Sequence, residues 1–204
     1  MACMTNVLPL ARPTLRQPDP EPRLQGRVRL YSRGVAAVFA GLAVLSALLL
    51  VTALFAIVFY TGDRLWIGSG GVLIGKPGST AGWVTFGSVP LAHRLVYVVV
   101  GAVRYSPKVA ILANQWALFR LYGRGVVFAR ANALRIRDTG LLLILDGVLP
   151  FACHVVLSTT GYEIDHRWMH LGSLQEVALG AVVVVIAEVM KVGREIEEER
   201  SLFV

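Results

Sequence analysis

The stretch that decides the fold is residues 35–60, which read VAAVFAGLAVLSALLLVTALFAIVFY. These 26 residues contain no Asp, Glu, Lys or Arg. A helix rises about 1.5 Å per residue, so a helix of this length exceeds the hydrocarbon core of a bilayer, about 30 Å. The stretch therefore predicts a tilted transmembrane helix. It starts too far along the chain and is too long for the apolar core of a signal peptide, so we expect it to stay in the mature protein.

Composition supports a membrane protein. Hydrophobic residues make up 55% of the 204 residues and charged residues only 16%, whereas soluble domains are about 25% charged. There are 20 Lys and Arg against 13 Asp and Glu, a net charge of +7. The apolar excess argues against disorder across most of the chain and against a simple nucleic-acid binder. We therefore predict no direct nucleic-acid partner.

Three further spans follow from the same pattern. Residues 91–121 hold two apolar runs on either side of Pro107, and we interpret them as one kinked helix rather than two segments. Residues 141–157 and 174–190 predict the third and fourth spans. The predicted fold class is thus all-α, an integral membrane bundle of four transmembrane helices. A short helix from about residue 129 to residue 140 is expected before the third span.

The remaining segments are polar or rich in Gly and Pro. Residues 1–26 are Pro-rich and predict a disordered tail, which precedes one transmembrane domain at residues 27–204. Residues 61–89 predict a Gly-rich outer loop, in which a short hairpin around Gly78 is one option. Residues 191–204 predict an acidic cytoplasmic tail.

The distribution of positive charge predicts the orientation. Fourteen Lys and Arg lie in the two tails and the central loop, four lie in the outer loops and their flanks, and two lie inside the second span. Cytoplasmic segments of membrane proteins carry the excess of Lys and Arg. Both termini are therefore predicted to be cytoplasmic, in a multi-pass protein of the inner (plasma) membrane.

Ionisable residues within the spans form the candidate site. A charge at the centre of a membrane helix costs about 2.5–3.5 kcal/mol on the insertion scale, so such residues usually pair or face a cavity. Helical rise places Lys108, Asp146 and Glu188 at one depth near the cytoplasmic side. A neutralising ion pair is the favoured interpretation, and an ion or proton pathway is the alternative. Arg104 and His154 are expected farther outward than this cluster.

Two charged segments are expected at the cytoplasmic face. The first either sets topology and contacts anionic headgroups or docks a protein; its members are Arg120, Arg124, Arg130, Arg135 and Arg137. The second is either a solvated helix face or an interaction tail for a basic partner; its members are Glu195, Glu197, Glu198 and Glu199.

No pattern in the sequence predicts catalysis. His166 and His170 have helical spacing and acidic neighbours, but a solvated loop is favoured over a metal site there. The glycines around Lys76 lack the spacing and the following helix of a phosphate-binding loop. We therefore predict no catalytic residue, no metal and no cofactor, and an enzyme is the least supported class of function.

Small residues predict two details of packing. A seam on the first span either receives another helix or reflects ordinary composition; it consists of Ala36, Ala40, Ala43 and Ala47, with Gly34 and Gly41 beside it. Gly123 and Gly125 are expected to end the second helix. Asn132 is expected to cap the next helix through its side-chain oxygen.

Two segments resemble a known family. They read LFRLYGRGVVFARANALR at residues 118–135 and AEVMKVGREIEEERSL at residues 187–202. The chain resembles, from about residue 27 to its end, the bacterial membrane-protein family known as domain of unknown function 2975. That family has the patterns LF..Y..G..F...NA..LR..G and G.EL.EE..LTV. The matching residues are Leu118, Phe119, Tyr122, Gly125, Phe128, Asn132, Ala133, Leu134, Arg135 and Gly140, then Gly193, Glu195, Ile196, Glu198, Glu199 and Leu202.

The resemblance implies a small bacterial inner-membrane protein with no catalytic residues to carry over. Family members are often encoded beside small helix-turn-helix regulators, which implies a cytoplasmic regulatory partner. We thus expect a regulatory or scaffolding protein whose partners are the bilayer, a cytoplasmic protein, and either its own copies or other membrane proteins. The alternative is a transport or ion-conducting subunit that uses Lys108, Asp146 and Glu188.

Overall fold

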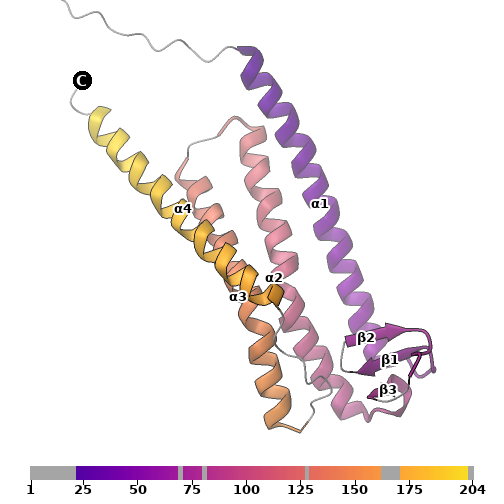
Figure 1. The fold of residues 1–204 in the computed structure, drawn as a ribbon. Coiled ribbons are helices and arrows are strands. Elements are labelled where there is room, and N and C mark those ends of the chain that lie inside the picture. The colour runs from indigo at the N-terminus through magenta and orange to yellow at the C-terminus, as the bar shows by residue number, and fades with distance from the viewer. Residues whose placement is uncertain (1–21, 69–70, 80–81, 127–128, 162–170, 202–204) are drawn as a thin grey trace, which may run out of the picture.

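The computed structural model describes residues 22–68, 71–79, 82–126, 129–161 and 171–201. Four long helices run up and down: α1 Pro22–Phe59, α2 Leu91–Gly123, α3 Arg130–Thr159 and α4 Leu171–Ser201 (Figure 1). Within these residues, three helical stretches are long and apolar enough to cross a membrane: Arg29–Phe59, Leu91–Gly123 and Arg130–Thr159. The start of α1 and the end of α4 lie at one end of the molecule, the terminal end, and a small sheet lies at the other, the sheet end.

The helices form an open row. Helix α1 packs on α2, α2 on α3 and α3 on α4, and no other two helices share a substantial contact in the described part of the chain. Figure 1 shows α1 at one edge of this row. Large apolar side chains of α1, such as Leu48 and Phe55, are consequently exposed. Such surfaces suit a lipid environment, where apolar side chains need no protein cover.

Several helix boundaries differ from the predicted ones. Helix α1 begins at Pro22. Proline is well tolerated in the first turn of a helix. Residues 22–26 are therefore helical and do not belong to the predicted tail. Residues 1–21 lie outside the described part. Helix α3 joins the predicted short helix and the third span into one element. Helix α4 continues to Ser201, so most of the predicted acidic tail is helical.

Residues 61–89 correct the all-α prediction, because they form a three-stranded antiparallel sheet. Strand β1 (Leu65–Gly68) lies in the middle, between β2 (Gly71–Ile74) and β3 (Trp83–Thr85). A short 3-10 helix, η1 (Phe86–Ser88), leads on toward α2. Aromatic and β-branched residues favour strands, and short strands of this kind are easily overlooked within a Gly-rich segment.

The hairpin does not lie around Gly78, the position considered from the sequence. It joins β1 to β2, with Gly68 opposite Gly71. Gly78 lies between β2 and β3, which pair with β1 and not with each other. The turn around Gly78 therefore does not connect neighbouring strands.

Helix α2 continues through Pro107 as a single element. Proline has no amide hydrogen, which leaves the carbonyl of Val103 without its usual helical donor. The hydroxyl of Ser106 donates to that carbonyl at 3.0 Å. Serine side chains commonly compensate for proline inside membrane helices in this way.

Candidate functional site: a charge cluster on three helices

An ion pair joins α2 to α3. The Lys108 Nζ atom lies 2.5 Å from Asp146 Oδ2, and Glu176 Oε1 of α4 lies 3.9 Å from the same nitrogen. The Asp146 side chain is only 6% exposed, whereas that of Lys108 is 48% exposed. The Asp146 carboxylate is thus buried against its cation, while about half of the Lys108 side chain is exposed. Three helices contribute to this cluster of Lys108, Asp146 and Glu176.

Glu176, and not the predicted Glu188, is the acidic residue that α4 brings to Lys108. Val184 of α4 packs against Gly140 of α3. Because α3 and α4 are antiparallel, Glu188 lies about ten residues, or about 15 Å, from the level of Asp146. Glu188 is exposed near the terminal end. The prediction took Gly140 as the membrane boundary, but α3 begins ten residues earlier, so the depth was misjudged.

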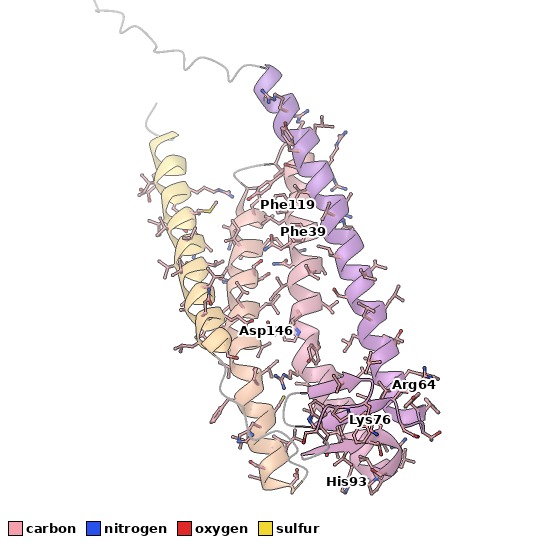
Figure 2. All side chains as sticks on the ribbon, turned by 45° about the vertical axis from the view of Figure 1, so that its right-hand side comes forward. Phe39, Arg64, Lys76, His93, Phe119 and Asp146 are labelled. Atoms are coloured by element: carbon pink, nitrogen blue, oxygen red, sulfur yellow. The ribbon has the colours of Figure 1, made fainter. Side chains whose placement is uncertain are left out.

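The contacts between α1 and α2 give the depth of the cluster. Gly101 of α2 lies beside Leu54 of α1, where a Cβ atom on the glycine would be 3.3 Å from the leucine methyl. Seven residues farther along this antiparallel pair, Lys108 is level with Ala47. Ala47 lies in the middle of the apolar stretch 35–60. Figure 2 likewise places Asp146 between the Phe39 and Phe119 rings near the terminal end and Arg64 and Lys76 at the sheet end.

Arg104 lies one helical turn from Lys108, toward the sheet end. It is partly exposed, and within the described residues it has no carboxylate within 4.0 Å. His154 is partly exposed on α3 and is not a member of the ion pairs of Lys108. The structure thus brings Arg104 near the cluster from the side of α2.

A second polar contact between α2 and α3 was not predicted from the sequence. The buried Asn114 side chain donates to the Arg135 carbonyl at 2.7 Å and to Thr139 Oγ1 at 2.9 Å. Arg135 Nη1 in turn donates to Asn114 Oδ1 at 3.0 Å, and Gln115 donates to Thr139 at 3.2 Å. Asn114, near the centre of the apolar run 109–119, was the available signal. Arg135 therefore helps to hold two helices together in addition to lying at the surface.

The other arginines of the predicted basic surface differ in their surroundings. The Arg120 guanidinium lies 4.9 Å from the centre of the Trp116 ring, a cation–π arrangement. Arg137 Nη2 lies 3.9 Å from Asp138 Oδ1, with both side chains nearly half exposed. Arg124 and Arg130, which flank the turn between α2 and α3, are exposed, as is Arg120.

The turn after α2 ends the helix as predicted, with one difference at Asn132. Gly125 adopts a φ of 83°, and its amide donates to the Tyr122 carbonyl at 2.9 Å. The Val126 amide donates to Leu121 at 3.1 Å, which completes a Schellman motif. Asn132 is fully buried, and its amide nitrogen donates to the Val126 carbonyl at 2.7 Å. The side-chain nitrogen, rather than the predicted oxygen, thus makes the bond to the turn.

Helices α3 and α4 approach closely at glycines. A Cβ atom on Gly180 would lie 2.6 Å from the Gly140 carbonyl oxygen, and one on Gly147 would lie 2.5 Å from the Ser173 carbonyl oxygen. Only glycine permits this distance. The predicted alanine seam on α1 faces α2 in part, with Ala36 buried. Its flanking glycines have open space around them.

Arg94 has a structural role that the sequence did not reveal. It is buried at the start of α2, and its Nη1 donates to the carbonyls of Val58 and Tyr60 at 3.2 Å each. Its Nε and Nη2 donate to the carbonyls of Val89 at 2.9 Å and Gly87 at 3.2 Å. The last carbonyls of a helix lack helical partners and favour a nearby cation. Arg94 therefore fastens the end of α1 to the sheet end of the molecule.

The acidic residues after the fourth predicted span lie on the last turns of α4. From the contact of Val184 with Gly140, Arg194 is level with the first residue of α3. Residues 195–201, the α4 extension, therefore project about 10 Å beyond α3 at the terminal end. Glu195 and Glu199 are exposed there. The side chains of Glu197 and Glu198 lie outside the described part of the structure.

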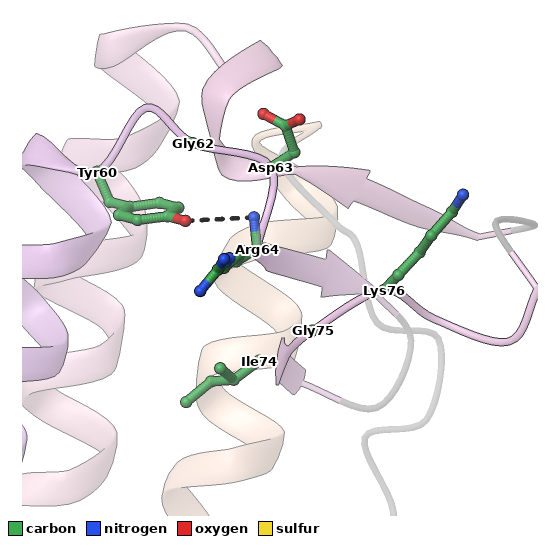
Figure 3. A pocket seen from close by; sticks show the side chains of 7 residues that line it. All are labelled: Tyr60, Gly62, Asp63, Arg64, Ile74, Gly75 and Lys76. Carbon is green, nitrogen blue, oxygen red and sulfur yellow. Dashed lines mark hydrogen bonds between the residues drawn. The ribbon is translucent and has the colours of Figure 1, made fainter.

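A shallow hollow lies at the sheet end (Figure 3). It is lined by Tyr60, Gly62, Asp63, Arg64, Ile74, Gly75 and Lys76. The Arg64 amide donates to the Tyr60 hydroxyl at 3.3 Å across its rim. No group of three metal-ligating side chains occurs among the described residues, and His166 and His170 lie outside them.

Comparison of the chain with protein-family models, curated proteins and solved structures finds no match. The resemblance to the domain of unknown function 2975 family therefore stays a prediction from the two motif segments.

Proposed function

We propose that this chain is a multi-pass protein of the bacterial inner membrane with four spans and both termini in the cytoplasm. Three helices meet the length and hydropathy that a span requires, and α4 supplies the fourth through residues 174–190. The start of α1 and the end of α4 lie at one end of the molecule, which agrees with an even number of spans. The arginines at this end follow the positive-inside rule.

The proposed role is regulatory or scaffolding, with the α4 extension as the contact for a cytoplasmic protein. The observation that carries this proposal is the helical projection of residues 195–201 beyond α3. Glu195 and Glu199 are exposed there, and the segment carries four glutamates in its sequence. The arginines at the ends of α2 and α3 lie nearer the membrane. The resemblance suggests a small helix-turn-helix regulator as the partner.

Crosslinking in living cells, followed by mass spectrometry, tests this role. We expect a cytoplasmic protein to be captured by the wild type and lost when Glu195, Glu197, Glu198 and Glu199 are all changed to Gln. A matched control changes Asp63, which lies at the sheet end, to Asn. Equal capture by all three proteins would refute a role for the α4 extension, and reporter fusions at both termini test the topology separately.

The second candidate is an ion- or proton-conducting subunit. The observation that favours it is the position of the partly exposed Lys108 in the middle of the apolar zone. Flux into liposomes that depends on pH or voltage, and that is lost in Asp146→Asn, would support conduction. The scaffolding role is preferred because Asp146 is already buried against a cation, which leaves no free carboxylate in this pair.

A further inference from the structure

One face of the helix row carries charged side chains at mid-depth. We call this the charged face and define it by Arg104 and Lys108 of α2 and Glu176 of α4. Lys108 contacts both Asp146 and Glu176, so the face extends from α2 across α3 to α4. All three of its side chains are at least partly exposed.

Within one chain, the charges on this face are incompletely matched. Lys108 makes its close contact with the buried Asp146, at 2.5 Å. Glu176 is 3.9 Å from Lys108, and its side chain is 36% exposed. Arg104 has no carboxylate within 4.0 Å in the described part of the chain. Arg104 therefore has no acidic partner among the described residues, and Glu176 has only its longer contact with Lys108. One cation and one anion are thus available for contacts with another chain.

These two residues lie at nearly the same depth. Arg104 is four residues from Lys108 toward the sheet end, and Gly147 of α3 packs on Val177 of α4. Gly147 also contacts Ser173. Counting residues along the antiparallel helices from these contacts places Arg104 and Glu176 two to four residues apart, or about 3–6 Å in depth. Both residues thus occupy the same layer of the membrane.

We propose that a second copy of this chain covers the charged face, in a two-fold dimer whose axis runs along the membrane normal. Rotation about such an axis keeps every residue at its depth, so Arg104 of each copy meets Glu176 of the other. A patch that carries both signs is self-complementary, as a two-fold interface requires. A partner of a single sign would match only half of it. Charged groups exposed to lipid at this depth are otherwise unfavourable.

Charge reversal in separate copies tests this pairing. Arg104→Glu and Glu176→Arg should each lower the dimer fraction in liposomes about tenfold or more, because like charges then meet across the interface. Mixing the two variants should restore association, since each copy then offers the sign that the other needs. Energy transfer between donor-labelled and acceptor-labelled copies measures the dimer fraction.

Two further variants complete the design. Arg104→Glu/Glu176→Arg in one chain should also restore the dimer, and Glu188→Arg, exposed elsewhere on α4, should leave it unchanged. If only the variant with both changes in one chain recovers, the pairing lies within one chain and the proposal fails. A monomeric wild type also overturns it. The proposal rests on the membrane topology above, and terminal reporter fusions show separately whether that topology holds.

Discussion

Helix α3 packs on its two neighbours through different chemistry. Toward α2 it presents Asp146 and Thr139, which bond to Lys108 and Asn114. Toward α4 it presents Gly140 and Gly147, where the two backbones approach closely. Directional bonds fix the register of α2, because a shift by one residue breaks them. Glycine contacts instead depend on close approach, because dispersion forces fall off steeply with distance.

The largest expected effect comes from removing a partner of the ion pair on the α2 side. Lys108→Met leaves the buried Asp146 carboxylate without its cation, which costs about 3–5 kcal/mol in comparable buried pairs. We expect a marked loss of folded protein in detergent, measured by yield and thermal unfolding. Asp146→Asn should act in the same direction.

The variant Lys108→Met/Asp146→Asn should recover part of this loss, because no buried charge is then left alone. Two losses that simply add would show that the residues do not interact.

Adding a side chain at the glycine contact between α3 and α4 should lower the stability of the protein. Gly180→Val places a side chain where the Gly140 carbonyl lies, and overpacking of this kind costs about 1–3 kcal/mol. Thermal unfolding of the purified protein measures the change. Gly41→Val is the matched control, because that glycine has open space around it on α1. Equal melting temperatures for both variants would contradict a tight glycine contact.

The hydrogen bonds on the α2 side should each contribute less. Asn114→Ala removes three bonds to α3, and membrane hydrogen bonds average about 0.6 kcal/mol, so a loss of about 1–2 kcal/mol is expected. Gln115→Ala removes a single bond of 3.2 Å and should cost less than half as much. The reverse order in a denaturation series would show that Asn114 is not the centre of this contact.

The smallest effect is expected within α2 itself. Ser106→Ala removes the donor that compensates for Pro107, at a cost of about 0.5 kcal/mol. Ser46→Ala on α1 is the control, since no hydrogen bond of that hydroxyl occurs among the described residues. Unfolding midpoints of the two variants, compared in one detergent, measure the difference. A larger effect at Ser46 would contradict the compensation.

The sequence predicted the parts of the fold that depend on local composition. Three helical stretches with the required length and hydropathy include residues 35–60 and the run through Pro107. The pairing of Lys108 with Asp146 also followed from helical rise, because both residues lie in apolar runs of opposite direction. The sheet around Trp66 was missed, since its strands are three or four residues long and lack a clear alternation.

Residues that act through distant contacts were harder to predict. Arg94 entered the sequence analysis only as one of the four charges of the outer loops and their flanks, although its four carbonyl partners include two at the end of α1. Glu188 was chosen over Glu176 because depth was counted from a single assumed boundary. An error of a few residues in the assumed boundary of a helix shifts the predicted depth of every residue on that helix. Counting residues from such a boundary therefore cannot select the right carboxylate.

The sequence by itself determined that this chain has long apolar helices and that its positive charge gathers in alternate segments. Both properties follow from local composition, because the length of an apolar segment and the positions of charged residues do not depend on tertiary contacts. Only the tertiary structure decided which residues are level with one another. The register between antiparallel helices depends on contacts such as Val184 with Gly140 and Leu54 with Gly101, which join residues more than forty positions apart. The contacts of Lys108 with Asp146 and Glu176 then place Arg104, Lys108 and Glu176 on one face.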